Sequence, residues 1–401
     1  MALDLTSFAS ALKAHYTSDK VQNAVYKDNP LLAMMPKMED FGGKNLPIPI
    51  IYGNPQGRSA SFANAQANKT SSQLKDFVLT RAKDYSLASI DNETLEASKG
   101  NSNAFMEAAT TEIDGAIHSA ARSLAIAMYG SGSGKIGRLS ATSGVTTLIT
   151  LSEPEDVTNF EKGQTLVLST ADGGGSVKTG TLSVTGIDRD LGTVTVTPSM
   201  ATLSAVGAVN DYIFVQGDYD AKIKGLQAWI PNSAPSSTAF FGVDRTSDVT
   251  RLAGVRFDGS AMPIEEALNK AASRLAREGG KPDYCFISYS KWADLENALG
   301  SKVQYIDMKV NPEVGFRGIQ INGPRGPIKV VPDQNCPNDR AFLLQMDVWK
   351  LYSLGKAPKI LDTDGLKMLR DSAADSVEIR VGYYAQIGCR APGYNCNLQL
   401  A

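Results

Sequence analysis

Apolar and polar positions change their spacing several times along this chain, and each spacing predicts a different element. Residues 103–129 place apolar side chains three and four positions apart, which predicts one amphipathic helix. About 27 helical residues at roughly 1.5 Å each span on the order of 40 Å, enough to run along a whole domain. The predicted apolar face consists of Met106, Ala109, Ile113, Ile117, Ala120, Leu124 and Met128.

Two stretches of alternating apolar residues precede this helix and flank a long polar segment. Lys44–Tyr52 and Leu74–Ile90 are predicted to be the strands of a hairpin, and Pro47 and Pro49 favour an edge position for the first strand. The tip, Tyr52–Gln73, is rich in Asn, Gln, Ser, Ala and Gly, so we expect it to become ordered by contact. A hairpin this long cannot bury both faces by itself, so we expect it to lie on another copy of the same chain.

The residues before the hairpin, 1–43, are predicted to form an arm. Leu5, Phe8 and Leu12 recur at helical spacing, which predicts a short amphipathic helix. A second apolar patch follows Asn29-Pro30 and consists of Leu31, Leu32, Met34 and Met35. Two interpretations of this patch stay open, core packing and docking on a neighbouring subunit.

Residues 143–216 have a different texture, because Thr, Val, Leu and Gly dominate and alternate in Thr193–Thr197 and in Thr165–Thr170. Turn signals at Asp172–Gly175 and Asp190–Gly192 separate the runs. The pattern predicts a small β-barrel or sandwich of about six strands. Eight acidic side chains stand against three basic ones here, so the module should face away from DNA if the protein binds near it.

From residue 217 onward the pattern is mixed. Pro263 is predicted to open a helix that Gly279-Gly280 closes. A second helix is predicted from Ser290, and Asn322-Gly323 is the signal for a hairpin turn. Strands are predicted at Tyr284–Ser288, Pro327–Val331, Ala341–Gln345 and Trp349–Ser353, and around the alternating Val377, Ile379, Val381 and Tyr383. The fold class is therefore α+β.

Composition narrows the class of protein. The chain has 401 residues, of which 42% are hydrophobic and 20% charged, as in ordinary globular proteins with two or three cores. A formal net charge of −2 argues against a protein whose binding energy comes mainly from neutralising phosphates. The first residues lack the pattern of a secretory signal, and no apolar stretch is long enough for a membrane helix, so we expect synthesis in a cytosol and no membrane contact.

Residues capable of chemistry are few and scattered. His15 and His118 are the only histidines, and the four cysteines lack metal-site spacing, so buried reduced thiols are expected. The G-x-G-x-x-G match at Gly132–Gly137 follows a helix instead of a strand, which indicates a flexible linker. Asp362–Gly365 lacks ligands of a calcium loop. We therefore predict no catalytic residue, no cofactor and no metal, and a protein that is not an enzyme.

Taken in order, the arm, the extended loop, the long helix and the mixed domain resemble the major capsid protein of tailed bacteriophages, which has the Hong Kong 97-like fold. Four C-terminal segments resemble the closing stretch of that family: Gly315–Pro337, Leu343–Gly355, Asp362–Gly365 and Asp375–Asn395. The resemblance implies an N-terminal arm (1–43), an extended loop (44–90) and a spine helix of the peripheral domain (91–142). An inserted β-domain (143–216) and the remaining peripheral and axial domains (217–401) would follow.

The resemblance also implies a function. Such chains form hexamers and pentamers that close into an icosahedral shell, the virion capsid, around double-stranded DNA, with a scaffolding protein, a portal and in some cases a decoration protein as partners. The implied inter-subunit contacts are Leu5, Phe8, Leu12, Tyr52, Arg58, Phe62, Lys69 and Phe77. The alternatives are an encapsulin-like nanocompartment shell, an enzyme of unrecognised class, and a phage tail or baseplate component.

Overall fold

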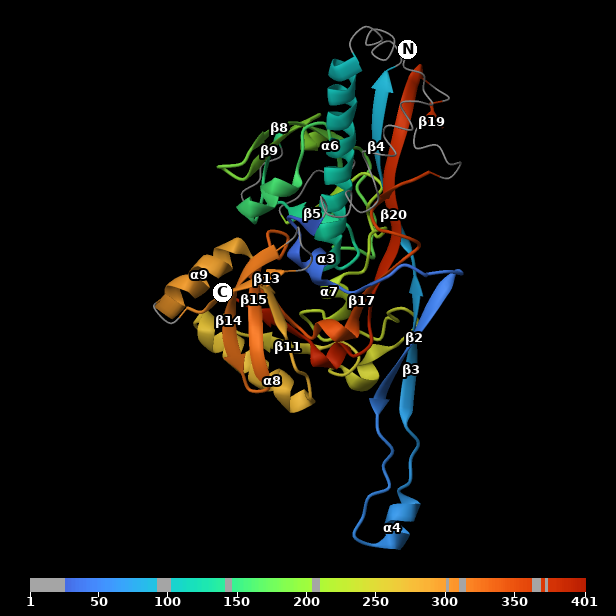
Figure 1. The fold of residues 1–401 in the computed structure, drawn as a ribbon, viewed down its shortest axis with the longest axis vertical. Helices are drawn as coiled ribbons and strands as arrows, with labels where there is room; N and C mark the ends of the chain where they lie inside the picture. Colours follow the sequence, from blue (N-terminus) through green and yellow to red (C-terminus); the bar gives the residue numbers. More distant parts are fainter. Residues whose placement is uncertain are drawn as a thin grey trace. The chain divides into compact units, whose positions relative to one another are not determined.

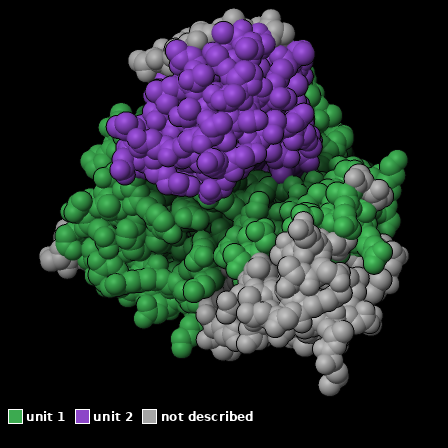
Figure 2. Space-filling view, turned by 90° about the horizontal axis from the view of Figure 1, so that it is seen from above, with its two compact units in different colours: residues 1–129, 229–401 green, residues 130–228 purple. Residues whose placement is uncertain are grey.

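The computed structural model describes residues 26–91, 102–140, 146–203, 210–300, 303–309, 315–362, 369–371 and 374–401, with the backbone alone for 102–109 (Figure 1). The chain divides into two compact units, which Figure 2 colours separately. Unit 1 consists of Met1–Tyr129 together with Trp229–Ala401, and unit 2 is the continuous stretch Gly130–Ala228. Each unit has a buried apolar cluster of its own.

The long helix of unit 1, α6 (Ser102–Tyr129), confirms the predicted spine. From Ile113 onward its predicted apolar face is buried, while His118 on the opposite face is exposed. α6 packs against two long strands, β4 (Ala82–Asp91) and β20 (Ser376–Cys389). The sheet to which they belong has the order β1 (Lys37–Met38), β17 (Trp349–Ser353), β20, β18 (Lys359–Ile360), and β4 and β19 (Leu369–Arg370) also pair with β20.

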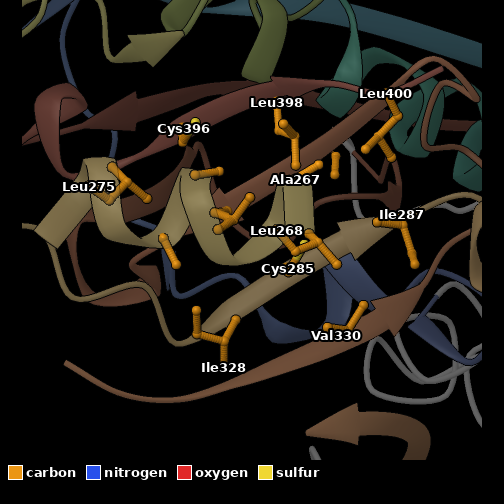
Figure 3. Packing of buried hydrophobic residues seen from close by; sticks show 14 of the residues in the cluster. Ala267, Leu268, Leu275, Cys285, Ile287, Ile328, Val330, Cys396, Leu398 and Leu400 are labelled. Carbon is orange, nitrogen blue, oxygen red and sulfur yellow. The ribbon is translucent and has the colours of Figure 1, made fainter. Parts of the chain in front are cut away.

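The C-terminal part of unit 1 is built on a seven-stranded sheet. Its order is β11 (Val255–Asp258), β21 (Cys396–Gln399), β16 (Arg340–Leu344), β12 (Tyr284–Ile287), β15 (Gly326–Pro332), β14 (Gly315–Gly323), β13 (Tyr305–Lys309). Helix α8 (Ile264–Glu278) lays Leu268 and Leu275 on this sheet, where they meet Cys285, Val330 and Leu398 (Figure 3). As predicted, α8 follows Pro263 and ends at a left-handed glycine, Gly279. Helix α9 (Tyr289–Leu299) follows β12.

One predicted turn was wrong. Gly323 and Gly326 are directly paired across β14 and β15, so the two turn residues are Pro324 and Arg325, not Asn322 and Gly323. Asn322 instead pairs with Pro327 within the ladder. The Asn-Gly signal identified the hairpin correctly. It placed the turn two residues too early, because β14 continues through Gly323.

The arm enters unit 1 through the short helix α3 (Pro30–Met34). Leu31, Leu32 and Met35 are at most 1% exposed, so this patch belongs to the core of its own subunit. Next, β1 pairs in parallel with β17. Leu5, Phe8 and Leu12 lie outside the described residues.

Unit 2 is a closed six-stranded barrel. Its strands follow the order β5 (Lys135–Arg138), β10 (Tyr212–Val215), β7 (Thr165–Ser169), β8 (Leu182–Asp188), β9 (Thr193–Thr197), β6 (Leu148–Thr150). The two ends of this sheet also meet, because the Ser140 N–H donates to the Thr150 carbonyl and the Ser152 N–H to the Arg138 carbonyl, both at 2.9 Å. The interior contains Phe160, Leu168, Val194 and Ile213, among others.

The barrel extends beyond the predicted range 143–216, because β5 precedes it. The Gly132–Gly137 segment therefore begins a strand and is not the flexible linker that we predicted. Gly132 and Gly134 both have positive φ, and a Cβ at Gly134 would overlap the carbonyl oxygen of Asp218. These glycines allow a tight turn at the base of the barrel.

Candidate assembly surface

The predicted hairpin is present, but its return strand is split in two. β2 (Asn45–Gly53) pairs with β3 (Gln73–Thr80) in a separate two-stranded sheet, whereas β4 leaves it to pair with β20 (Figure 1). The break falls at Arg81, whose guanidinium donates to the Phe41 carbonyl and lies 5.0 Å from the centre of the Phe41 ring. Phe41 is fully buried, so this contact fixes the base of the hairpin.

One face of the hairpin, the inner face, packs on the rest of unit 1. Ile48, Ile50, Phe77 and Leu79 form it, and none is more than 4% exposed. The Phe77 ring lies 5.2 Å from Trp229 and 6.2 Å from Phe240, measured between ring centres. Phe77 was expected at a contact between subunits, but it is part of the core of its own subunit. Its strand register explains this, since Phe77 is directly opposite Ile48 and shares its face.

The other face, which we call the outer face, is exposed and mostly apolar. It carries Pro47, Pro49, Ile51, Leu74 and Val78, together with one carboxylate, Asp76, directly opposite Pro49. The pairs Pro47–Val78 and Ile51–Leu74 are each directly opposite, so their side chains are neighbours on one surface. Ile51 is 64% exposed, Leu74 53% and Val78 36%. A row of apolar side chains that its own chain leaves in water is the usual mark of an interaction surface.

The prolines determine how this hairpin can make contacts. The Val78 N–H donates to the Phe241 carbonyl at 2.9 Å, so it points away from β2. The Pro47–Val78 pair is therefore a non-hydrogen-bonded pair, and the nitrogens of Pro47 and Pro49 face the open edge of β2. Because proline carries no N–H, this edge cannot accept a further strand along its length. The hairpin thus offers a side-chain face and not a backbone edge.

The tip is ordered by bonds within itself. The Thr70 N–H donates to the Gln56 carbonyl at 2.7 Å, and the Gln56 N–H donates to the Thr70 hydroxyl at 2.8 Å. A short helix, α4 (Phe62–Ala67), lies at the tip and has no buried residue, a helix that the sequence did not predict. Phe62 is 83% exposed. Arg58 and Lys69 are also exposed, and the tip sequence contains no acid, so it is positively charged.

Tyr52 lies where the hairpin leaves the body, and it is half-buried. Its carbonyl oxygen accepts a hydrogen bond from the Arg251 guanidinium. Of the predicted contact residues, Arg58, Phe62 and Lys69 therefore lie at the tip. Tyr52 lies near the end of β2, where Arg251 binds it, and Phe77 is buried. Sequence reasoning missed Ile51, Leu74 and Val78, although the two-residue period from Phe77 would have separated them from the inner face.

Two more exposed apolar side chains lie on β4, on the face opposite α6, where Arg380 of β20 is directly opposite Leu87. Tyr85 is 48% and Leu87 56% exposed there. The Tyr85 and Tyr384 hydroxyls lie 3.2 Å apart, and this hydrogen bond raises the pKa of Tyr384. On the face toward α6, Asp84 Oδ2 accepts hydrogen bonds from Ser123 Oγ at 2.6 Å and from the Tyr383 hydroxyl at 3.3 Å.

Reactive groups in the described residues are buried or dispersed. The four cysteines are free and buried, as predicted, and burial raises the pKa of every one of these thiols. Within the described part of the chain, no three acidic, histidine or cysteine side chains are grouped to hold a metal ion. None of its described helices is both long and apolar enough to span a membrane.

Three comparisons with known proteins concern the family and the fold of the chain. Residues 208–366, less than half of the chain, match the family model of the SU10 major capsid protein. The fold is similar to the cyanophage A-1(L) capsid asymmetric unit, with a TM-score of 0.53 and 12% identity over 92% of each chain. No curated protein sequence matches.

Two further structures have TM-scores below 0.5. The capsid of a native GTA particle has a TM-score of 0.45 and 9% identity over 94% of this chain and 90% of that one. The virus-like particle of Pyrococcus furiosus has a TM-score of 0.40 and 8% identity over 95% and 96%.

Proposed function

We propose that this chain, a tailed-bacteriophage major capsid protein by its family match and its Hong Kong 97-like fold, uses the outer face of its hairpin to bind a second copy of itself. The observation that carries the proposal is the contrast between the two faces of one hairpin. The inner face is anchored in the subunit, while the outer face is exposed and mostly apolar, with Ile51 and Leu74 at the end nearest the tip.

Burial of this face gives a favourable free energy of association. Apolar surface contributes roughly 25 cal/mol for each Å² removed from water. The inner face fixes the hairpin before contact, so little conformational entropy is lost when the outer face binds. One such contact is weak, but a closed shell repeats it in every subunit, and many weak contacts stabilise the whole.

The tip would extend the same contact. Phe62 is large, apolar and exposed at the far end of the hairpin, so it would fill a recess on the neighbouring subunit. Arg58 and Lys69 would place two positive charges beside it and fix the orientation. Leu5, Phe8 and Leu12 of the arm remain proposed contacts on the basis of the sequence.

The finer organisation follows as a proposal from the same identification. Capsomers would be hexamers and pentamers that close an icosahedral shell around double-stranded DNA, assembled in the host bacterial cytoplasm. A scaffolding protein and a portal would take part in assembly, and a decoration protein is compatible with it. The net charge of −2 suits a container, because a strongly basic wall would hold the packaged DNA in place.

We also propose domain roles. α6 and the sheet around β20 would form the peripheral domain, and the seven-stranded sheet would form the axial domain. Unit 2 interrupts unit 1 between Tyr129 and Trp229, closes its own barrel and encloses its own core, as expected for an inserted domain. Its acidic surplus would keep it away from the packaged DNA.

The family match favours a phage shell over an encapsulin-like nanocompartment or an enzyme. To test shell formation, the protein is expressed with and without its neighbouring genes and studied by negative-stain electron microscopy and light scattering. We expect closed particles or capsomer rings. A uniform monomer or dimer under every condition would rule out the shell, and particles that enclose protein instead of DNA in infected cells would support the nanocompartment.

A further inference from the structure

Asp333, which directly follows β15, is a buried carboxylate that assembly through the hairpin does not use. Asp333 is only 1% exposed. Oδ1 accepts hydrogen bonds from the Asn335 N–H at 2.9 Å and from Asn335 Nδ2 at 3.2 Å. Oδ2 accepts from the Tyr129 hydroxyl at 2.9 Å and from the Leu31 N–H at 3.3 Å.

These bonds join three segments that are distant in sequence. Leu31 belongs to α3, Tyr129 is the last residue of the spine helix α6, and Asp333 belongs to the C-terminal sheet region. Asn335 strengthens the junction, because its Nδ2 also donates to Asn29 Oδ1 at 2.9 Å. Helix α3 belongs to the predicted arm, 1–43, so this carboxylate holds the described part of the arm.

We propose that the Asp333 carboxylate is a protonation-sensitive latch, which holds α3 and the arm attached to it more tightly in mild acid than at neutral pH. The proposal concerns the subunit alone and does not depend on shell formation. Its central observation is one carboxylate that is removed from water and binds the arm, the spine helix and the C-terminal region at the same time.

The direction follows from burial. Removal of Asp333 from water raises its pKa, and the four hydrogen bonds offset this only in part. When α3 undocks and water reaches the carboxylate, the pKa returns to about 3.9. Undocking therefore releases a proton, so it becomes less favourable as the pH falls from neutral toward about 4.

The titratable groups that face this carboxylate are mostly neutral over that range. Tyr129 of α6, Tyr289 of α9 and Cys336 of the same loop all have raised pKa values, in part because of Asp333 itself. Cys285 of β12, Asp339 and Arg340 act on Cys336 in turn. Asp28, an acid just before α3, acts on Tyr289.

Two more charged side chains, Lys37 and Glu39, lie just after α3 in the sequence. Lys37 donates to the Ala33 carbonyl at 3.4 Å, and burial lowers its pKa to about 8, so it stays charged below neutral pH. Glu39 acts on Lys37 and on Tyr26. Asp28 and Glu39 are therefore the acids to remove as controls.

Hydrogen exchange of the full chain between pH 7 and pH 4 tests the latch, with rates corrected for the intrinsic effect of pH. The protection of amides in 27–38 is compared with that of α8 in the same sample. We expect α3 protection to rise as the pH falls, on the order of ten-fold for each unit by which docking raises the pKa. A flat ratio of α3 to α8 protection would overturn the proposal.

Four variants assign the effect to Asp333. Asp333→Asn should abolish the pH dependence, whereas Asp28→Asn and Glu39→Gln should retain it. Tyr129→Phe removes one donor to the ionised carboxylate and keeps the ring, so it should lower α3 protection at pH 7 more than at pH 4. A wild-type pH dependence in Asp333→Asn would contradict the latch. If Asp333→Asn does not fold, Tyr129→Phe supplies the test: an equal loss of α3 protection at pH 7 and pH 4 would contradict the latch.

Discussion

The barrel of unit 2 and the β2–β3 hairpin of unit 1 are both antiparallel and both rich in apolar residues, yet they use them differently. The barrel pairs its first and last strands through Ser140 and Ser152 and encloses Phe160 and Val194. The hairpin has two strands, so it has two faces and can bury only one on its own body. Ile51 and Leu74 remain in water on the other.

This difference distinguishes a self-sufficient domain from a part that needs a partner. A closed barrel has no open edge and no open apolar face, and therefore it needs no neighbour to complete it. A two-stranded hairpin is marginal unless something covers both faces. The stability of the barrel should depend on its own core, and the outer face should matter only when subunits meet.

The largest effect is expected from charges on the outer face. Ile51→Glu together with Leu74→Glu would place two carboxylates in the contact, at a cost of several kcal/mol per interface when they are desolvated. We expect the concentration needed for assembly to rise about 100-fold or more. Light scattering during assembly, followed by electron microscopy, measures this.

The same variant should leave the free subunit unchanged, because both side chains are exposed there. The free energy of unfolding should stay within about 0.5 kcal/mol of wild type. Leu191→Glu is the matched control, since Leu191 is 70% exposed in the turn between β8 and β9 of the barrel. If Leu191→Glu reduced assembly as much as the double variant does, the effect would not be specific to the outer face.

Next in size is a cavity in the barrel. Phe160 is fully buried, and Phe160→Ala should destabilise unit 2 by about 3–5 kcal/mol. All three tryptophans, Trp229, Trp292 and Trp349, lie in unit 1, so fluorescence follows that unit and hydrogen exchange of barrel peptides follows unit 2. Exchange in the barrel should accelerate while the tryptophan transition stays in place. A joint shift of both signals would show that the units unfold together.

Phe77→Ala tests the inner face. It removes the ring that contacts Trp229 and Phe240 and should destabilise unit 1 by about 3 kcal/mol. The midpoint of the tryptophan fluorescence transition should move to a lower denaturant concentration. The hydrogen-exchange rates of barrel peptides should not change. If the variant keeps wild-type stability but fails to assemble, Phe77 is an inter-subunit contact as the sequence first suggested.

The smallest effect is expected from Pro49→Ala, which restores one N–H on the open edge of β2. Stability should change by no more than about 1 kcal/mol. The variant should associate less specifically, because an open edge with its N–H groups can accept strands. Irregular aggregates beside normal particles would support this role, whereas a uniform loss of particles would indicate that Pro49 packs in the contact.

Much of the fold could be predicted from the sequence because its periods are clear. The spine helix, α8 and the strands β12, β16 and β17 were predicted to within two residues, since spacing and capping glycines act locally. The barrel was recognised from its alternation, but β5 was missed. Its sequence, Lys135–Arg138, is short and has two charged ends, and only pairing with β10 makes it a strand.

The assembly surface was harder to predict because both faces of β2 are apolar. Leu46, Ile48 and Ile50 alternate with Pro47, Pro49 and Ile51, so the pattern alone does not say which set is buried. The family resemblance implied that Phe77 is an inter-subunit contact, but its ring packs on Trp229 of the same unit. Tertiary packing determines which face of the hairpin is buried, and the local sequence pattern does not indicate it.

The central claim is that the outer face is covered by a second copy, and the reactivity of one thiol tests it most directly. The four native thiols are buried and have raised pKa values, so Ile51→Cys supplies the reactive site, with Leu191→Cys as its control. Maleimide labelling is compared between free subunits and assembled particles. We predict that Cys at position 51 reacts in subunits and is protected at least about ten-fold in particles, while the control reacts in both. Equal labelling of position 51 before and after assembly would contradict the account.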